Sequence, residues 1–161
     1  GGLALTLTGA DIAEQMTAIA RRRHPLHTVV TAPAERLPLD DASQHIVSCA
    51  FGVRNIVARS HALREFHRVL KPKGQLLIME FMKPQRGAVM GHLRDWYTAH
   101  MLPLIGGMIS KKREHYAYLP RSMRHFLTTE EFTRELQEAG FVLTTVKTYT
   151  LGVTTLFVAT R

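Results

Sequence analysis

Arg68-Val-Leu-Lys-Pro-Lys-Gly-Gln-Leu-Leu-Ile-Met-Glu-Phe81 contains the end of a helix, a turn and the whole of a strand. Pro72 and Gly74 stop the helical pattern that precedes them and mark a turn. Gln75–Phe81 then forms an apolar run of strand length, which is typical of a parallel strand covered on both faces. The stretch therefore predicts an α/β fold built on a parallel sheet.

Helix and strand patterns alternate upstream of this stretch. Ala58–Leu70 is the clearest helix, because its apolar residues share one face while its arginines lie elsewhere. Asp11 and Glu14 have the spacing of a capping box at the start of an earlier helix, and Ala34–Asp41 reads as a loop. The order of elements predicts a doubly wound, parallel sheet. These elements are a strand at Leu3–Thr8, a helix at Ala13–Arg23, and strands at Thr28–Thr31 and Ile46–Phe51.

The pattern changes after Pro84. Thr128 and Glu131 have the spacing of a capping box, and Gly140 is placed to end the helix that the box begins. Two segments rich in β-branched residues flank Gly152 and predict an antiparallel pair. The predicted elements are a helix over Val89–Leu104, a basic loop over Gly106–Tyr118, a helix over Glu130–Ala139, and strands over Phe141–Tyr149 and Val153–Thr160.

The composition indicates a single soluble, cytoplasmic domain over residues 1–161. A chain of 161 residues is long enough to bury its own core, and no apolar run approaches the roughly 20 residues that span a bilayer. No signal-peptide pattern is expected at its start. The single cysteine, Cys49, lies in an apolar run and is expected to be a small buried hydrophobe. The histidine pairs lack cysteine or acidic partners at metal-site spacing, so we expect no metal.

The net charge of +8 is the most informative feature of the composition. It favours nucleic acid, an anionic membrane surface or acidic ligands as partners, and a solvated basic face is an equal alternative. The clusters sit on different elements without interleaved aromatic residues or a reader motif, so we expect no nucleic acid. These clusters are Arg21–Arg23, Lys71 with Lys73, and Lys111–Arg113.

Residues 68–81 closely resemble the signature of the menaquinone/ubiquinone C-methyltransferase family (the UbiE/MenG group). That signature reads Arg-Val-Leu-Lys-Pro-Gly-Gly and then a strand ending in Glu-Phe-Ser; here Lys73 replaces one glycine and Met82 replaces the serine. Further segments match the family in order and spacing, so the resemblance covers nearly the whole chain. They are Ala34-Glu-Arg-Leu-Pro-Leu39, Phe51-Gly-Val-Arg-Asn55, Tyr118-Leu-Pro-Arg-Ser-Met-Arg124, and Ala139-Gly-Phe141 followed by Tyr149-Thr-Leu-Gly-Val153.

The resemblance implies a Rossmann-like class I methyltransferase sheet, mostly parallel with an antiparallel C-terminal hairpin, and a substrate-side insertion over residues 84–127. It implies an S-adenosylmethionine (SAM)-dependent enzyme that methylates a ring carbon of a prenylated quinol, either demethylmenaquinol or the ubiquinol precursor. That carbon becomes nucleophilic when a neighbouring phenol, with an ordinary pKa of about 10, loses its proton. Delivery of a prenyl tail from the inner face of an anionic membrane would also explain the positive charge. A homo-oligomer or a biosynthetic complex is compatible with this reading.

Four residues are candidates for the substrate side. Arg54 follows a strand end, where open α/β sheets bind ligands, and the resemblance implies a catalytic role in quinol deprotonation. Because arginine stays protonated, it would stabilise the phenolate or position a water; a structural ion pair is the alternative. Asn55 would orient substrate or cap the following loop. Tyr116 and Tyr118 would line a quinone channel or pack their loop onto the core.

Four residues are candidates for the cofactor side. The resemblance makes Asp11 the acid that accepts hydrogen bonds from the SAM ribose, although a helix cap would look the same in sequence. Ile12 would pack on the adenine or belong to the core. Ala34 matches a position whose backbone approaches the adenine, and Ala50 stands where a serine would line the cofactor pocket. Pro33 replaces a family residue whose polar side chain can contact the adenine amine.

The glycine-rich loop of the family is not found in this sequence. It should lie about 20 residues before the ribose-binding acid, yet Asp11 is close to Gly1. We therefore expect the first strand and this loop to be missing and the chain to be N-terminally incomplete. Three explanations stay open: a fragment of a longer enzyme, a separate chain that supplies the missing unit, or a non-catalytic quinol- or lipid-binding relative. Pro33 and Ala50 favour the third slightly, because truncation does not explain them.

Overall fold

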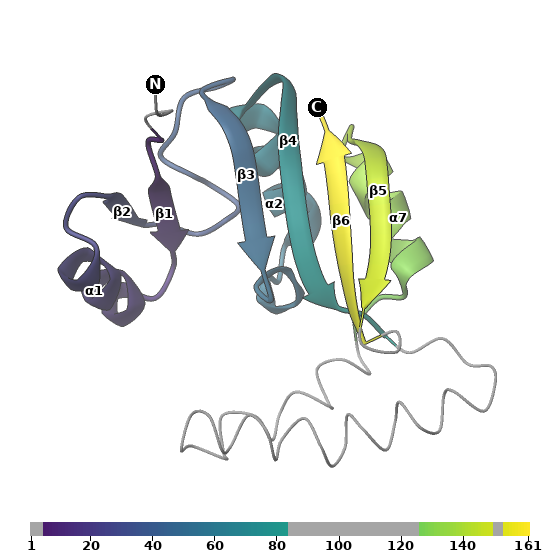
Figure 1. Ribbon diagram of the computed structural model, residues 1–161, viewed down its shortest axis with the longest axis horizontal. Helices are drawn as coiled ribbons and strands as arrows, with labels where there is room; N and C mark the ends of the chain where they lie inside the picture. Colours follow the sequence, from purple (N-terminus) through teal and green to yellow (C-terminus); the bar gives the residue numbers. More distant parts are fainter. Residues whose placement is uncertain (1–4, 84–125, 150–152) are drawn as a thin grey trace, which may run out of the picture.

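The computed structural model describes residues 5–83, 126–149 and 153–161 of the chain. The described residues form a two-stranded sheet and a four-stranded sheet, with helices packed against both (Figure 1). The predicted helix over Val89–Leu104 and the basic loop over Gly106–Tyr118, which make up most of the expected insertion, lie outside the described residues. None of the helices in the described ranges is long and apolar enough to cross a membrane.

The two-stranded sheet is a β-α-β unit. β1 (Thr8–Asp11) and β2 (Thr28–Thr31) pair in parallel, and α1 (Glu14–Arg23) connects them. The hydroxyl of Thr17, which is buried in α1, shares a hydrogen bond of 2.8 Å with the hydroxyl of Thr31. This contact ties the helix to the end of β2.

Two predictions for this unit were wrong in detail. Of the strand expected over Leu3–Thr8, residues 5–7 lie outside any strand and β1 begins at Thr8, because pairing with β2 covers only the residues from there to Asp11. The predicted capping box is absent: α1 has Ala13 as its N-cap, with no side-chain cap bond from Asp11 or Glu14. Asp11 is itself the last strand residue, so its Oδ1 accepts a hydrogen bond from the Ala13 amide at 2.8 Å instead.

The four-stranded sheet contains most of the remaining described chain. Its strands are β3 (Gln44–Ala50), β4 (Leu70–Phe81), β5 (Val142–Tyr149) and β6 (Thr154–Thr160). The helices that accompany them are the 3-10 helix η1 (Val53–Asn55), α2 (Arg59–Val69) and α7 (Thr129–Glu138). The strand order is β3-β4-β6-β5, with β3 and β4 parallel and β6 antiparallel to both β4 and β5. The predicted parallel strands and the antiparallel C-terminal hairpin are therefore confirmed.

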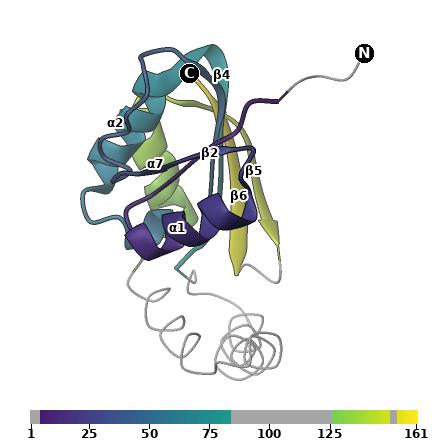
Figure 2. The same ribbon diagram turned by 90° about the vertical axis from the view of Figure 1, so that its left-hand side faces the viewer.

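α2 and α7 cover one face of this sheet and form the main core with it (Figure 2). Phe132 of α7 meets Phe157 of β6 edge-to-face, with ring centroids 5.0 Å apart. Along β4, every second residue from Leu76 to Glu80 is buried under the helices, whereas Leu77 and Met79 are half-buried. The sequence predicted a strand covered on both faces, but within the described chain only the helix-covered face is fully buried.

The ends of α7 follow from its local sequence. Thr128 accepts a hydrogen bond from the Glu131 amide at 3.2 Å, and the Glu131 carboxylate accepts one from the Thr128 amide at 2.8 Å. The predicted capping box is therefore confirmed. Gly140 follows the helix with a φ of 95°, a left-handed conformation that favours glycine. A Cβ at Gly140 would lie only 3.0 Å from the His67 ring, so a side chain there would also crowd that ring.

The predicted turn at Pro72–Gly74 lies inside β4 as an irregularity. The pairing of β3 with β4 shifts register between Gln44 and Ile46, opposite this turn. Lys73 has a φ of 65°, in the left-handed region, and it occupies a position where the resembling family carries glycine. β4 nevertheless includes the residues before the turn, because Leu70 pairs with Gln44 of β3.

The backbone of Lys73 leads to a prediction about stability. Lys73→Gly should raise the free energy of unfolding by about 1 kcal/mol, because glycine lacks the Cβ that crowds a carbonyl in the left-handed conformation. Equilibrium urea unfolding would measure the change. Lys73→Ala is the matched control, since it removes the charge but keeps the Cβ, and it should give no gain. Equal stabilisation by both variants would mean that charge, not backbone conformation, is responsible.

Candidate functional site

The carboxyl ends of the parallel strands define the candidate site. β1, β3 and β4 run in the same direction, toward the lower edge of the molecule in Figure 1. Asp11 ends β1, Ala50 ends β3 and Phe81 ends β4. Open α/β sheets bind their ligands outside such ends, so the predicted cofactor and substrate residues are expected to lie here.

A strained turn follows β3. Phe51 has a φ of 57°, which is uncommon for an aromatic residue, and its amide donates to the Met79 carbonyl at 2.8 Å. Its ring packs on Phe81 with centroids 4.5 Å apart. Gly52 comes next, where a Cβ would lie 2.9 Å from the Cys49 sulfur. The chain therefore reverses sharply and delivers η1, with Arg54 and Asn55, to the end of β4.

Arg54 is held by a buried carboxylate. Its Nη1 donates to Glu80 Oε1 at 2.8 Å and to the Phe51 carbonyl at 2.6 Å, while its backbone amide donates to Glu80 Oε2 at 3.2 Å. The side chains of Arg54 and Glu80 are only 4% and 0% exposed. The guanidinium also lies 5.4 Å from the centre of the Phe81 ring. Arg54 therefore occupies one fixed position, with its charge balanced by Glu80.

This geometry bears on both readings of Arg54. The structural ion pair that the sequence left as the alternative is present, and its partner is Glu80. The same contacts hold the guanidinium in place at the carboxyl end of β4. Asn55 is exposed beside it in η1, and its amide donates to the Gly52 carbonyl at 3.0 Å.

Glu80 is the residue of this site that the sequence analysis missed. It is the one acidic residue in the apolar run over Gln75–Phe81, and that exception was the available signal. In the structure it accepts hydrogen bonds from Arg54 and from the Phe81 amide at 2.8 Å. Buried carboxylates are seldom found without such partners. Through these hydrogen bonds Glu80 holds the segment that follows β3 against the end of β4.

Cys49 lies beneath the same turn as an ordinary packing residue. The sequence predicted a small buried hydrophobe; Cys49 does pack against the main core, but it is only half-buried. Burial raises the pKa of its thiol, and the nearby Glu80 charge acts in the same direction. A raised pKa keeps the thiol protonated near neutral pH, so Cys49 lacks the thiolate character of a nucleophile.

The end of β1 carries the candidate cofactor residues Asp11 and Ile12. The Asp11 carboxylate is exposed, and its bond to the Ala13 amide occupies only part of its acceptor capacity. Ile12 is 72% exposed, so the alternative that it belongs to the core is wrong. An exposed carboxylate beside an exposed apolar side chain fits a ribose diol next to an adenine ring. These residues therefore fit the nucleoside half of SAM.

The remaining predicted residues lie on separate segments. Ala34 is half-buried in the loop after β2 and packs against the main core. Ala50 is exposed at the end of β3, one residue before the strained turn. Tyr116 and Tyr118 lie outside the described residues. The structure thus groups Ala50 with Arg54 and Asn55, and it groups Asp11 with Ile12.

The buried pair predicts a stability effect. Glu80→Gln keeps the shape of the side chain but removes its charge, which should cost on the order of 3 kcal/mol of unfolding free energy. Glu135→Gln is the matched control, since Glu135 forms a two-point pair with Arg59 that is 20–28% exposed. That loss should be about 1 kcal/mol or less. Urea unfolding of both variants measures these losses. Equal losses of unfolding free energy would show that burial does not make the Glu80 pair more stabilising than the partly exposed pair.

Sequence comparisons identify relatives along the whole chain. The profile described as the ubiE/COQ5 methyltransferase family matches residues 2–161. The ubiquinone/menaquinone biosynthesis C-methyltransferase UbiE of Campylobacter jejuni is 40% identical over 157 residues, covering 98% of this chain and 67% of that protein. The demethylmenaquinone methyltransferase of Chlorobaculum tepidum is 46% identical over 135 residues, covering 84% and 55%. The chain thus spans between about half and two thirds of the length of these relatives.

Solved structures agree at the level of fold. A SAM-dependent methyltransferase from Thermotoga maritima superposes with a TM-score of 0.66 at 23% identity, covering 95% of this chain and 72% of that one. The [4+2]-cyclase SpnF gives a TM-score of 0.70 at 15% identity, covering 98% and 66%. Since a cyclase shares the fold, these likenesses establish architecture alone. With its Rossmann-like class I fold and a family match from residue 2 to residue 161, the chain belongs to the ubiE/COQ5 methyltransferase family of SAM-dependent enzymes.

Proposed function

We propose that this chain carries out the SAM-dependent C-methylation of a prenylated quinol, either demethylmenaquinol or the ubiquinol precursor. The observation that carries the proposal is the family match over residues 2–161, together with relatives whose names specify ubiquinone/menaquinone C-methylation and demethylmenaquinone methylation. The non-catalytic alternative has no comparable support.

Arg54 is the proposed catalytic residue. SAM supplies an electrophilic methyl group, and the protein must favour the phenolate form of a ring whose phenol ordinarily has a pKa of about 10. The guanidinium cannot take the proton, because it stays protonated itself. It can donate a hydrogen bond to the developing phenolate or to a water that removes the proton. Its contacts with Glu80 and Phe51 support this role, since a donor fixed in advance needs no reorganisation during reaction.

Asp11 is the proposed partner of the cofactor ribose. Its two carboxylate oxygens could accept hydrogen bonds from the two hydroxyls of the diol, and its exposure leaves it open to do so. Ile12 would cover the adenine, with the backbone at Ala34 at the adenine edge and Ala50 beside the cofactor. Asn55, Tyr116 and Tyr118 are proposed to contact the quinol.

The proposal includes a peripheral contact with an anionic membrane, which would deliver the prenyl tail. Arg22 and Arg23 support it, because both are exposed at the end of α1. Arg21 is also exposed, but its Nε already donates to the Val29 carbonyl at 3.0 Å. A screened electrostatic attraction of this kind would place the protein at the inner face of the membrane.

The cofactor assignment is tested by titrating SAM calorimetrically. The chain should be measured alone and fused to the part of the Campylobacter jejuni relative that lies outside the match. In whichever form binds, Asp11→Asn should weaken SAM about 10- to 100-fold, because a charged hydrogen bond to the diol is lost. Glu14→Gln, which alters an exposed carboxylate three residues further on, should bind normally. Unchanged affinity in Asp11→Asn would remove Asp11 from the site.

The catalytic assignment is tested by quinol methylation in the same form of the protein. Arg54→Lys should lower kcat about 100-fold or more, because an ammonium on a flexible stem cannot reproduce the planar guanidinium that Glu80 and the Phe51 carbonyl hold in place. Arg64→Lys, at an exposed position of α2, is the matched control and should leave kcat unchanged. Normal turnover by Arg54→Lys would leave Arg54 with the structural role only. SAM binding without methylation by the unaltered protein would favour the non-catalytic alternative.

A further inference from the structure

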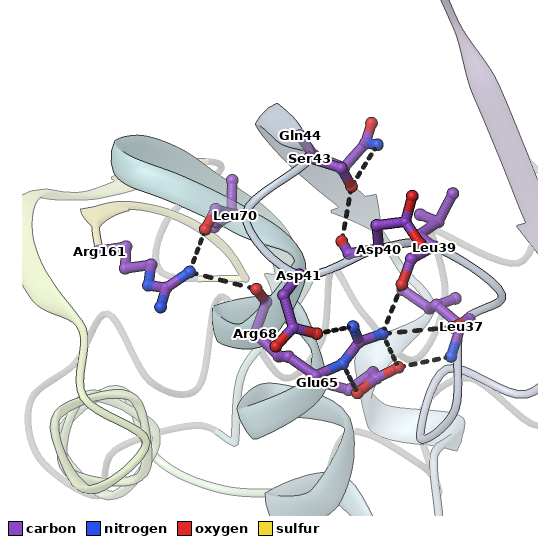
Figure 3. A network of polar contacts seen from close by, with 10 residues as sticks. All are labelled: Leu37, Leu39, Asp40, Asp41, Ser43, Gln44, Glu65, Arg68, Leu70 and Arg161. Carbon is purple, nitrogen blue, oxygen red and sulfur yellow. Dashed lines mark hydrogen bonds and ion pairs between the residues drawn. The ribbon is translucent and has the colours of Figure 1, made fainter.

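A polar cluster joins the end of α2 to the loop that precedes β3 (Figure 3). We call it the Arg68 cluster; its members are Leu37, Leu39, Asp41, Glu65 and Arg68. Nη2 of Arg68 donates to the Leu39 carbonyl at 2.8 Å and to the Leu37 carbonyl at 3.3 Å. Nη1 of Arg68 pairs with the Asp41 carboxylate. One side chain thus binds three residues of the loop.

Glu65 completes the cluster from the same helix. It takes a two-point pair from Arg68, with Nε to Oε2 and Nη2 to Oε1 both at 2.8 Å. Its Oε1 also accepts a hydrogen bond from the Leu37 amide at 2.7 Å. The bond from Arg68 holds the pKa of Glu65 below its ordinary value, so the carboxylate stays charged in the folded protein. Both backbone groups of Leu37 are therefore bound to the Glu65–Arg68 pair.

The backbone at the end of α2 is fixed as well. The Ala42 amide donates to the Arg68 carbonyl and the Ser43 amide to the Val69 carbonyl, both at 2.9 Å. Nη1 of Arg161 donates to the Arg68 carbonyl at 3.1 Å and also to the Leu70 carbonyl. A cation at a helix C-terminus also interacts favourably with the helix dipole. The backbone of Arg68 is therefore fixed, and its side chain binds Leu37, Leu39 and Asp41 from a rigid base.

The loop that Arg68 holds is the connection between the two sheets. It runs from the end of β2 to the start of β3, and no strand of one sheet is hydrogen-bonded to a strand of the other in the described ranges. At its first end, the Ala32 amide donates to the Asp11 carbonyl at 3.0 Å. At its other end it is held by Arg68. Pro33 and Ala34 lie between these two attachments, in a turn closed by the Arg36 amide on the Pro33 carbonyl at 3.1 Å.

We propose that Arg68 is a positioning residue for the cofactor: by holding Leu37, Leu39 and Asp41, it sets the position of Ala34, and of Asp11 beyond it, relative to the end of β3. The proposal rests on the proposed function, because it takes Asp11 and Ala34 as the nucleoside contacts. The Arg68 cluster joins two segments that resemble the family, Ala34–Leu39 and the stretch that begins at Arg68. Arg68 touches neither Asp11 nor Ala34 directly, so its effect must pass through the loop.

The first test needs no cofactor. Amide hydrogen exchange should be followed in the unaltered chain, Arg68→Lys, Glu65→Gln and the control Arg64→Lys. Arg68→Lys keeps the charge but loses the fork, so exchange at the Leu37 amide and over residues 34–39 should become at least about tenfold faster. Glu65→Gln is the milder variant and should act at the same amides. Unchanged exchange in both variants would overturn the proposal.

The second test measures SAM and quinol separately in the form of the protein that binds SAM. Arg68→Lys should raise the SAM dissociation constant and the KM for SAM about fivefold or more, with the KM for quinol and kcat at saturating SAM unchanged. Arg64→Lys should change none of these. A merely structural Arg68 would lower the melting temperature and leave both KM values alone, which would overturn the proposal. Failure of the unaltered protein to bind SAM would instead overturn the proposed function and, with it, this inference.

Discussion

The hydrogen bonding of β4 on both of its sides is the constraint on which the main sheet and its site depend. β3 pairs with it in parallel and β6 pairs with it antiparallel, so the end of β4 must lie between the turn after β3 and the start of β6. Side chains alternate along the strand, and Glu80 falls on the face covered by the helices. A one-residue slip would turn Glu80 away and bury Met79 instead. The register of one strand therefore decides whether Arg54 meets a carboxylate.

Two arginine–glutamate pairs fix the segments on either side of β3. Arg54 and Glu80 hold the turn that follows the strand, and Glu65 with Arg68 holds the loop that precedes it. In both pairs the carboxylate also binds a backbone amide, so each pair anchors a loop as well as balancing charge. A buried pair offsets its loss of hydration only when such additional hydrogen bonds are made. The irregular segments that carry the candidate site are thus held by polar contacts, while apolar packing holds the helices.

The sequence predicted most of the residues of the candidate site, but few of the contacts that these residues make. Arg54 was recognised because it follows a strand end, where open α/β sheets bind ligands, and Asp11 because the resemblance places a ribose-binding acid there. The partner of Arg54 was not, because Glu80 lies 26 residues away and reads in sequence as the end of an apolar strand. Ile12 could be read as core or as a ligand contact, and its exposure argues against the core alone. Arg68 was recognised as the first residue of the family signature, but its contacts with the loop before β3 were not predicted.

The sequence by itself determined most of the helices and strands in the described part of the chain, and it did so best where the signal is local. The strand over Thr28–Thr31 and the capping box at Thr128 needed nothing beyond neighbouring residues. Tertiary structure alone decided that Asp11 pairs with Thr31 as the last residue of β1, and that Lys73 turns left-handed inside β4. It also brought Arg68 to Leu37, 31 residues before it. The reason is physical: local patterns set the backbone of a segment, whereas contacts between distant residues depend on strand register and packing, which no single segment encodes.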